Sequence, residues 1–215
     1  MRQLSEDGQW WWDGRAWVPT AQVVVPQIPP TQLEQSGRVA AARGRLGRYG
    51  PSYIGTDSIL LSALVLPLHR RAEEAMRVYR AWTIEQLASA TAYLLGTDEP
   101  MVAGETALLE PQSLTGSWKR DLAVAVTAAH VLVFRMDSFD GQPRWIALAA
   151  RATEVTMEVR SAVSAMFRGG PALTVRGTNG EWVVQGSARV FNPGPVVEAW
   201  HQAAKTRDRE SRTGG

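Results

Sequence analysis

The sequence predicts an α+β fold in which a short tryptophan-rich hairpin and a helical segment precede an antiparallel, strand-rich domain that ends in a helix. Two observations carry this prediction. Before residue 96, apolar side chains recur every three or four positions, as they do on one face of a helix. After residue 100 they fall into short runs rich in Val, Leu, Phe and Trp, and turn-forming stretches separate these runs.

The composition limits the classes of function. With 215 residues, 45% of them hydrophobic and 20% charged, the chain has room for one or two globular domains. Its 23 basic and 21 acidic residues leave a formal charge of only +2, which argues against nucleic acid as the partner. The lack of cysteine excludes disulfides, thiolate metal sites and cysteine nucleophiles. Nearly all basic residues are arginines, a bias typical of bacterial genomes of high GC content.

Neither a secretory signal nor a membrane span is predicted. The N-terminus lacks a basic stretch followed by an apolar one. The longest apolar run, Ile59–Leu68, is interrupted by Ser62 and Pro67 and is far shorter than the about 20 residues that a spanning helix needs. We therefore expect a cytoplasmic chain, either in solution or peripheral to an anionic membrane surface.

The chain divides into five expected segments: a Trp-rich hairpin (1–20), a Pro/Gly/Arg-rich linker (21–56), a helical segment (57–96), a strand-rich domain (97–205) and a disordered tail (206–215). Prolines near the start of the linker favour extended backbone. Four dispersed arginines on its glycine-rich second half are typical of a solvated connection.

The helical segment is predicted to contain two helices. The first runs from about Ser58 to Leu66 and stops at Pro67, which removes a backbone donor. The second continues to Leu95, and Gly96 suits its end. Its apolar stripe comprises Leu68, Ala72, Ala75, Tyr79, Trp82, Leu87, Ala90 and Leu94. We expect this stripe to pack on the strand-rich domain, with oligomerisation through the helix as the alternative.

The strand-rich domain contains eight short apolar runs: ALLEP, LAVAVTA, HVLVFRM, WIALAA, TEVTMEV, AMFRG, ALTVRG and EWVVQG. Asn179-Gly180 between the last two predicts a tight hairpin. A final helix follows Asn192, with Pro195 in its first turn. Val196, Val197, Trp200 and Ala204 would line one face of that helix.

About seven antiparallel strands followed by one capping helix resemble a pleckstrin-homology-like (PH-like) domain, a β-barrel or sandwich, over residues 100–205. The resemblance is carried by four segments that match bacterial members of this superfamily: Val124–Thr127, Val131–Arg135, Trp145–Leu148 and Thr153–Val159. It implies a binding module that contacts protein along a sheet edge or anionic lipid in a basic loop pocket. The corresponding candidate for anion or lipid binding here is Lys119-Arg120.

The most distinctive local feature is SEDGQWWWDGRAWVP near the N-terminus. Asp13-Gly14 predicts a turn between two short strands, and alternation places Trp10 and Trp12 on one face and Trp11 on the other. The segment resembles a W-W-D-G-x-x-W-x-P motif found near the termini of actinobacterial proteins, often beside a membrane span. The matching residues are Trp11, Trp12, Asp13, Gly14, Trp17 and Pro19.

Two interpretations of this hairpin stay open. Its rings could pack on the chain itself, because an isolated two-stranded hairpin is marginal in water. Alternatively, they could form an aromatic platform for a proline-rich peptide, a partner protein or the lipid interface. The candidate partner-binding residues are Trp10, Trp12, Asp13, Gly14 and Trp17.

No enzyme signature is recognised. His69, His130 and His201 lack metal-ligand spacing, and Asp137 and Asp140 suit a turn better than a calcium loop. Phosphate-binding and nucleophile-elbow motifs are also missing. We therefore expect a non-enzymatic binding or adaptor protein with no metal and no cofactor, whose partner is a protein. The alternative is a structural or assembly protein of a bacterial or viral complex, which would oligomerise through the helical segment and strand edges.

Overall fold

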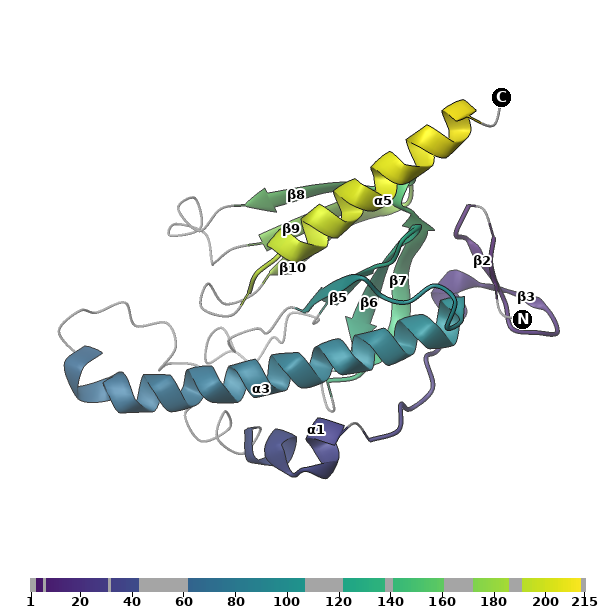
Figure 1. The fold of residues 1–215 in the computed structure, drawn as a ribbon. Coiled ribbons are helices and arrows are strands. Elements are labelled where there is room, and N and C mark those ends of the chain that lie inside the picture. The colour runs from purple at the N-terminus through teal and green to yellow at the C-terminus, as the bar shows by residue number, and fades with distance from the viewer. Residues whose placement is uncertain are drawn as a thin grey trace.

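Figure 1 shows the computed structural model of the chain, which describes residues 3–5, 7–30, 32–42, 62–106, 122–137, 141–160, 172–185 and 191–213. The N-terminal part contains β1 (Gln3–Leu4), β2 (Trp10–Trp12), β3 (Trp17–Pro19), the 3-10 helix η1 (Thr20–Gln22) and α1 (Gln32–Gln35). A long helix, α3 (Ser62–Leu95), follows. Then come β4 (Ala103–Thr106), β5 (Leu122–Val126), β6 (His130–Met136), β7 (Pro143–Arg151), η3 (Ala152–Glu154), β8 (Thr156–Arg160), β9 (Ala172–Gly177), β10 (Gly180–Gln185) and α5 (Gly194–Thr213).

The strands after α3 form two antiparallel sheets. Strands β4, β5, β6 and β7 make a four-stranded sheet in chain order, and β8, β9 and β10 make a three-stranded sheet with β9 in the centre. The predicted α+β class is confirmed. The prediction allowed a barrel or a sandwich; among the described strands, no pairing joins the two sheets into a closed barrel.

One hydrophobic core lies between the two sheets and α5. Its buried members come from alternate positions of β5, β6, β7, β9 and β10 and from one face of α5: Val124, Val126, Val131, Val133, Leu148, Ala150, Leu173, Val175, Val184, Val196, Ala199 and Ala203. The indole Nε1 of Trp200 donates to the carbonyl of Ala152 at 2.9 Å, which ties α5 to the end of β7. The predicted capping helix is therefore held by both packing and a hydrogen bond.

The second core covers the opposite face of the four-stranded sheet. It joins α3 and the N-terminal segment to the sheet through Leu4, Trp11, Val23, Val25, Ile28, Leu87, Ala90, Leu94, Ala123, Ala125, Leu132, Phe134, Met136, Ile146 and Ala149. Strands β5 and β6 are thus buried on both faces, which explains why LAVAV and HVLVF are continuous apolar runs.

The two predicted helices around Pro67 are one helix. Helix α3 runs unbroken through Pro67, and its first turns extend past the ends of the sheets (Figure 1). Pro67 lies in the second turn, where the helix loses the hydrogen bond that a backbone N–H at this position would donate to the carbonyl four residues earlier. Burial of Trp82 and Leu87 farther along stabilises the whole helix. It ends as predicted at Gly96. Residues 58–61, expected to begin the first helix, lie outside the described part.

The strand prediction departs from the structure at two places. Strand β4 was not predicted, because Ala103–Thr106 (AGET) has no apolar pattern. The β9–β10 hairpin turns at Thr178-Asn179, and Gly180 already pairs with Gly177, one position earlier than predicted. The runs ALLEP and AMFRG lie outside the described residues.

The segment expected to begin a linker is part of the fold. Val25 is fully buried, and its N–H donates to the carbonyl of Arg144 at 2.8 Å, while Val24 forms a β-bridge with Trp145. At the other end, α5 continues to Thr213, into the expected disordered tail; its lysine, arginine and glutamate residues are good helix formers. None of the described helices is long and apolar enough to cross a membrane.

Candidate functional site

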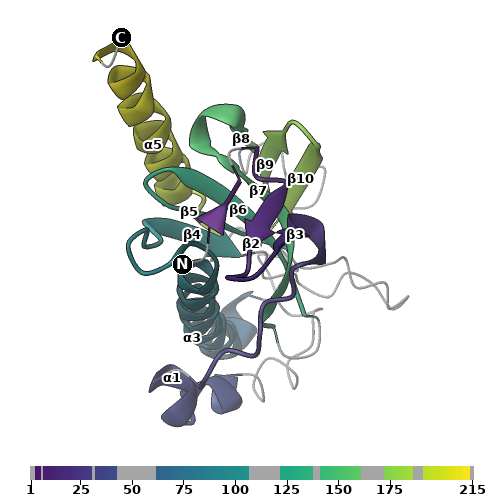
Figure 2. The same ribbon diagram turned by 90° about the vertical axis from the view of Figure 1, so that its right-hand side faces the viewer.

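The N-terminal strands form a small sheet with two chemically different faces. Strands β1, β2 and β3 are antiparallel, in the order β1-β2-β3. Leu4, Trp11 and Val18 stand opposite one another and share one face. The other face carries two neighbouring pairs, Trp12 with Trp17 and Trp10 with Pro19. Figure 2 shows β2 and β3 beside the C-terminal end of α3.

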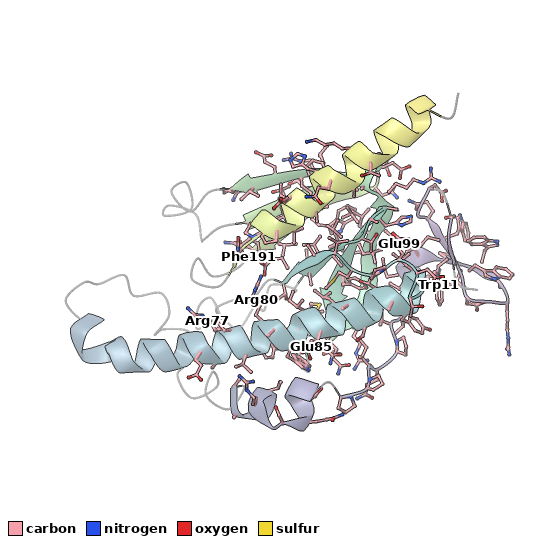
Figure 3. All side chains as sticks on the ribbon, in the orientation of Figure 1. Trp11, Arg77, Arg80, Glu85, Glu99 and Phe191 are labelled. Atoms are coloured by element: carbon pink, nitrogen blue, oxygen red, sulfur yellow. The ribbon has the colours of Figure 1, made fainter. Side chains whose placement is uncertain are left out.

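The first face anchors the hairpin to the rest of the protein. Trp11 is 5% exposed, and its indole Nε1 donates to the carbonyl of Leu94 at 3.1 Å. That carbonyl belongs to the last turn of α3, where carbonyls have no partner within the helix. The ring also lies 5.8 Å from that of Tyr93. Figure 3 shows Trp11 at the junction of the hairpin and α3.

A glycine allows the hairpin to approach the four-stranded sheet closely. Gly8 is buried, and a Cβ added to it would lie 1.8 Å from the carbonyl oxygen of Ala149 on β7. Its φ of +65° also favours glycine. The carbonyl of Gly8 accepts a hydrogen bond from Thr20 Oγ1 at 2.8 Å. Docking therefore depends on Gly8 as well as on Trp11.

Two carboxylates brace the turns at the ends of β2. Asp13 Oδ1 accepts hydrogen bonds from the N–H groups of Ala16 and Arg15, at 2.8 and 2.6 Å, and these bonds lower the pKa of Asp13. Gly14 in this loop has a φ of +106°. The predicted partner-binding residues Asp13 and Gly14 thus shape the hairpin turn, which spans residues 13–16 and is longer than the predicted tight pair.

The turn before β2 is built in the same way. Asp7 Oδ1 accepts from Ser5 Oγ at 2.6 Å and from the N–H of Gln9 at 3.1 Å, and both bonds lower the pKa of Asp7. Ser5 Oγ in turn accepts from the N–H of Trp10 at 2.9 Å. These contacts fix the position at which Trp10 enters β2.

The other face of the hairpin points away from the core. We call Trp10, Trp12, Trp17 and Pro19 the outer tryptophan face. Trp10 is 45% exposed and Trp17 is 47% exposed, whereas Trp12 is partly covered. The rings of Trp12 and Trp17 lie 5.6 Å apart at an angle of 55°, a favourable tilted contact. Three of the predicted partner-binding residues therefore lie together on one surface.

Three further clusters of polar side chains lie outside the hairpin. In the first, Arg80 Nε and Nη2 donate to the two carboxylate oxygens of Glu105 at 2.9 and 2.7 Å. Glu105 is fully buried and also accepts from the N–H groups of Thr106 and Asn192, at 3.1 and 3.0 Å. The hydrogen bond to Glu105 raises the pKa of Arg80. These bonds join α3, where Figure 3 labels Arg80, to β4 and to the segment just before α5, so the cluster has a structural role.

The second cluster lies where β5 turns into β6. Glu99 Oε1 accepts from Thr127 Oγ1 and lies 2.7 Å from His130 Nδ1. Burial acts to raise the pKa of Glu99, but the hydrogen bonds from His130 and Thr127 outweigh burial and lower it. Because Thr127 Oγ1 donates to the carboxylate and not to the imidazole, the three groups do not form a nucleophile–base–acid relay.

The third cluster is an exposed row of charges on the three-stranded sheet. Arg176 donates to Glu181 Oε2 at 2.6 Å and to Glu158 Oε2 at 3.0 Å. One arginine pairs with two glutamates across three strands, so the row keeps one net negative charge, and ion pairs this exposed contribute little to stability because water screens them. The row is consistent with a solvated sheet face.

The remaining predicted residues give no site within the described part of the chain. Lys119 and Arg120 lie outside it, and so does Asp140. His130 begins β6, as expected, and His201 is exposed on α5 with its ring 4.4 Å from that of Trp200. Across the described ranges, no group of three or more His, Asp or Glu side chains could hold a metal ion.

Sequence reasoning missed the residue on which the hairpin depends. Trp11 was named only as part of the motif, although the alternation already placed it opposite Trp10 and Trp12. The apolar neighbours Leu4 and Val18, which pair with Trp11, could have indicated the buried face.

Comparison of the chain with protein-family models and with curated proteins finds no match.

Proposed function

We propose that this chain is a non-catalytic binding or adaptor protein that recruits a protein partner through the outer tryptophan face. The single observation behind this proposal is that the hairpin has tryptophans on both faces, one buried and the others directed toward solvent. Trp11 is buried against α3, whereas Trp10 and Trp17 keep nearly half of their surface in contact with water. A hairpin needed only for packing would not require three further tryptophans on its solvent face.

The energetics favour a binding role for these rings. Tryptophan is enriched among the residues that dominate protein interfaces, where a few anchors carry most of the free energy of binding. Because Trp11 and the braced turns already hold the hairpin, Trp10 and Trp17 would lose little conformational freedom on binding. A preformed aromatic surface of this kind is suited to capturing a partner.

The scaffold of the proposed adaptor is a PH-like domain. This assignment is supported by the order of the described elements: a four-stranded antiparallel sheet, a three-stranded antiparallel sheet and then α5 packed over the core between them. The fold alone does not specify a ligand, because such scaffolds carry many unrelated binding functions. The hairpin, docked on the face opposite α5, would supply the specificity.

The experiment is chemical crosslinking of the tagged chain in its native host, followed by mass spectrometry of the captured proteins. Wild type is compared with Trp10→Ala/Trp17→Ala and with Trp145→Ala. Trp145 is a matched control because it is 42% exposed but lies on β7. We expect partners that are lost from the double variant and retained by Trp145→Ala. Identical sets of partners for all three proteins would refute the proposal.

The alternative, an assembly protein, is favoured by one observation. The 34-residue α3 would be about 51 Å long at about 1.5 Å per residue, and it extends past the sheets in Figure 1. Light scattering over a range of concentrations separates the two proposals. A mass that stays monomeric argues against assembly, and a stable oligomer that persists in Trp10→Ala/Trp17→Ala supports it.

A further inference from the structure

We propose that the outer tryptophan face binds a proline-rich segment of a separate protein, in the polyproline II conformation, with a basic residue next to the prolines. This inference rests on the proposed function and specifies its ligand class. The spacing of the rings, the edges of the small sheet and the charges around it support this ligand.

The spacing of the exposed rings suits this ligand. Trp12 pairs directly with Trp17, so Trp10 is the diagonal neighbour of Trp17. Diagonal neighbours across an antiparallel pair lie about 7–8 Å apart. A polyproline II helix repeats every three residues, or about 9 Å. Two prolines three positions apart can therefore each rest on one exposed indole, while the partly covered ring of Trp12 contacts that of Trp17.

Tryptophan also supplies the polar part of such a contact. Each indole carries one Nε1–H donor at its edge. A polyproline II helix makes no internal hydrogen bonds, so its carbonyls remain available as acceptors. Flat apolar rings with a donor at the edge are the groups that proline-recognising grooves use.

The edges of the small sheet disfavour addition of a β-strand as the mode of binding. Strand β1 has only two residues, and β3 has three and ends in Pro19. Short edge strands and an edge proline are devices that prevent pairing with a further strand. A ligand is therefore expected to use the face of the hairpin and not its edge.

The charges select a basic ligand over an anionic surface. Asp7 and Asp13 lie in the turns at the two ends of β2, and exposed aspartates such as these are ionised at neutral pH. Arg15 offsets one of these two charges, so the described turns of the hairpin remain net negative. An arginine or lysine beside the prolines would be attracted, and it could also stack on an indole. A membrane rich in anionic lipid would be repelled.

The test uses a fluorescein-labelled peptide of ten prolines with two arginines at one end as the probe. Fluorescence anisotropy is measured with the full chain, Trp10→Ala/Trp17→Ala and Trp145→Ala. We expect saturable binding that weakens at least about tenfold in the double variant, as for the loss of interface anchors, and that is unchanged in Trp145→Ala. A peptide with two glutamates in place of the arginines should bind more weakly. Thermal unfolding of each variant shows that it is folded.

Three results would overturn the inference. One is absent binding, or binding that Trp10→Ala/Trp17→Ala leaves unchanged. The second is binding to vesicles of equimolar phosphatidylcholine and phosphatidylserine that depends on the same two tryptophans, which would identify a membrane. The third is a dimer of the wild-type chain that the double variant abolishes. That result would make a second copy the ligand, since Pro26, Pro29 and Pro30 are themselves exposed.

Failure of this inference is distinguishable from failure of the proposed function. If the crosslinked partners depend on Trp10 and Trp17 but the proline peptide does not bind, the outer tryptophan face recruits protein by another chemistry. If neither the partners nor the peptide depends on these residues, both proposals are wrong.

Discussion

The decisive prediction concerns the different roles of neighbouring tryptophans. Replacing Trp11 with alanine removes a side chain that is 5% exposed. A tryptophan buries about 150–250 Å², worth about 4–6 kcal/mol at about 25 cal/mol per Å². Measured truncations of buried tryptophan cost about 3–5 kcal/mol. Because Trp11 belongs to the core that α3 shares with β5 and β6, we expect a loss of about 3–5 kcal/mol in the free energy of unfolding.

Two companion variants separate the contribution of the buried Trp11 ring to stability from those of its hydrogen bond and of the exposed Trp10 ring. Trp11→Phe keeps an aromatic ring and removes the Nε1–H that donates to Leu94, so it should cost about 1–2 kcal/mol. Trp10→Ala removes a ring that is 45% exposed, so by the same area bookkeeping it should cost roughly half as much as Trp11→Ala.

The assay is urea unfolding followed by far-ultraviolet circular dichroism, because the chain has 9 tryptophans and its fluorescence would mix their responses. Stability is compared through the midpoint and the slope of the transition. The reasoning is refuted if Trp11→Ala and Trp10→Ala differ by less than about 0.5 kcal/mol, since the hairpin would then contribute nothing through its inner face.

Three further predictions follow from buried polar groups. Arg80→Met leaves the fully buried Glu105 without its cation and should cost about 3 kcal/mol in urea unfolding, part of which Glu105→Gln restores in the double variant. The pKa of Glu99 in the folded protein lies below its ordinary value of 4.5, so the stability that Glu99 contributes is present at neutral pH. This stability is lost as the pH falls through 4.5 and then through the folded pKa. Glu99→Gln should therefore flatten the dependence of the unfolding midpoint on pH in this acidic range, and an unchanged profile would contradict this. Gln86 is fully buried and, within the described residues, neither the nitrogen nor the oxygen of its side-chain amide has a hydrogen-bond partner. Gln86→Met should therefore raise the free energy of unfolding by about 1–2 kcal/mol. A lower melting temperature of the variant would contradict this.

The elements that the sequence predicts well are those specified by local spacing. Leu87, Ala90 and Leu94 recur at helical intervals, and all three are fully buried on α3. The runs in β5 and β6 were recognisable because strands buried on both faces are apolar at every position. Neither inference requires knowledge of which segments meet in space.

Strand β4 shows why other elements were missed. Its sequence AGET is neither alternating nor apolar, and Glu105 within it would ordinarily indicate exposure. It is a strand because it pairs with β5, and its carboxylate is buried because Arg80 reaches it from α3. Arg80 and Glu105 are 25 residues apart in sequence, so the local pattern around either residue does not indicate that they form an ion pair. The contact between Trp11 and the Leu94 carbonyl, 83 residues apart, was unpredictable for the same reason.

The candidate site was predictable in part, because alternation separates the two faces of a strand but does not say which face is buried. Tryptophan occupies both faces of β2, so hydrophobicity alone could not decide between Trp11 and its neighbours. The decision comes from the pairing partners, since Leu4 and Val18 flank Trp11 whereas Gln3 and Trp17 flank Trp12. Asp13 is expected to contact a ligand because its carboxylate lies beside tryptophans, and the pattern does not show that its Oδ1 also accepts two hydrogen bonds within its own turn.

Anchoring and binding are coupled in this arrangement. Strands of two or three residues are too short to hold the outer tryptophan face in place alone, so the face exists only while Trp11 is docked. The apparent dissociation constant for a partner then equals the intrinsic constant divided by the docked fraction. Trp11→Ala, which removes the ring that docks the hairpin, should consequently weaken binding of the proline peptide although it leaves every outer residue in place. If the docked form stays dominant in that variant, hydrogen exchange will show protected β2 amides and the affinity will match wild type. Loss of affinity with full protection would mean that Trp11 acts on the ligand by some other route.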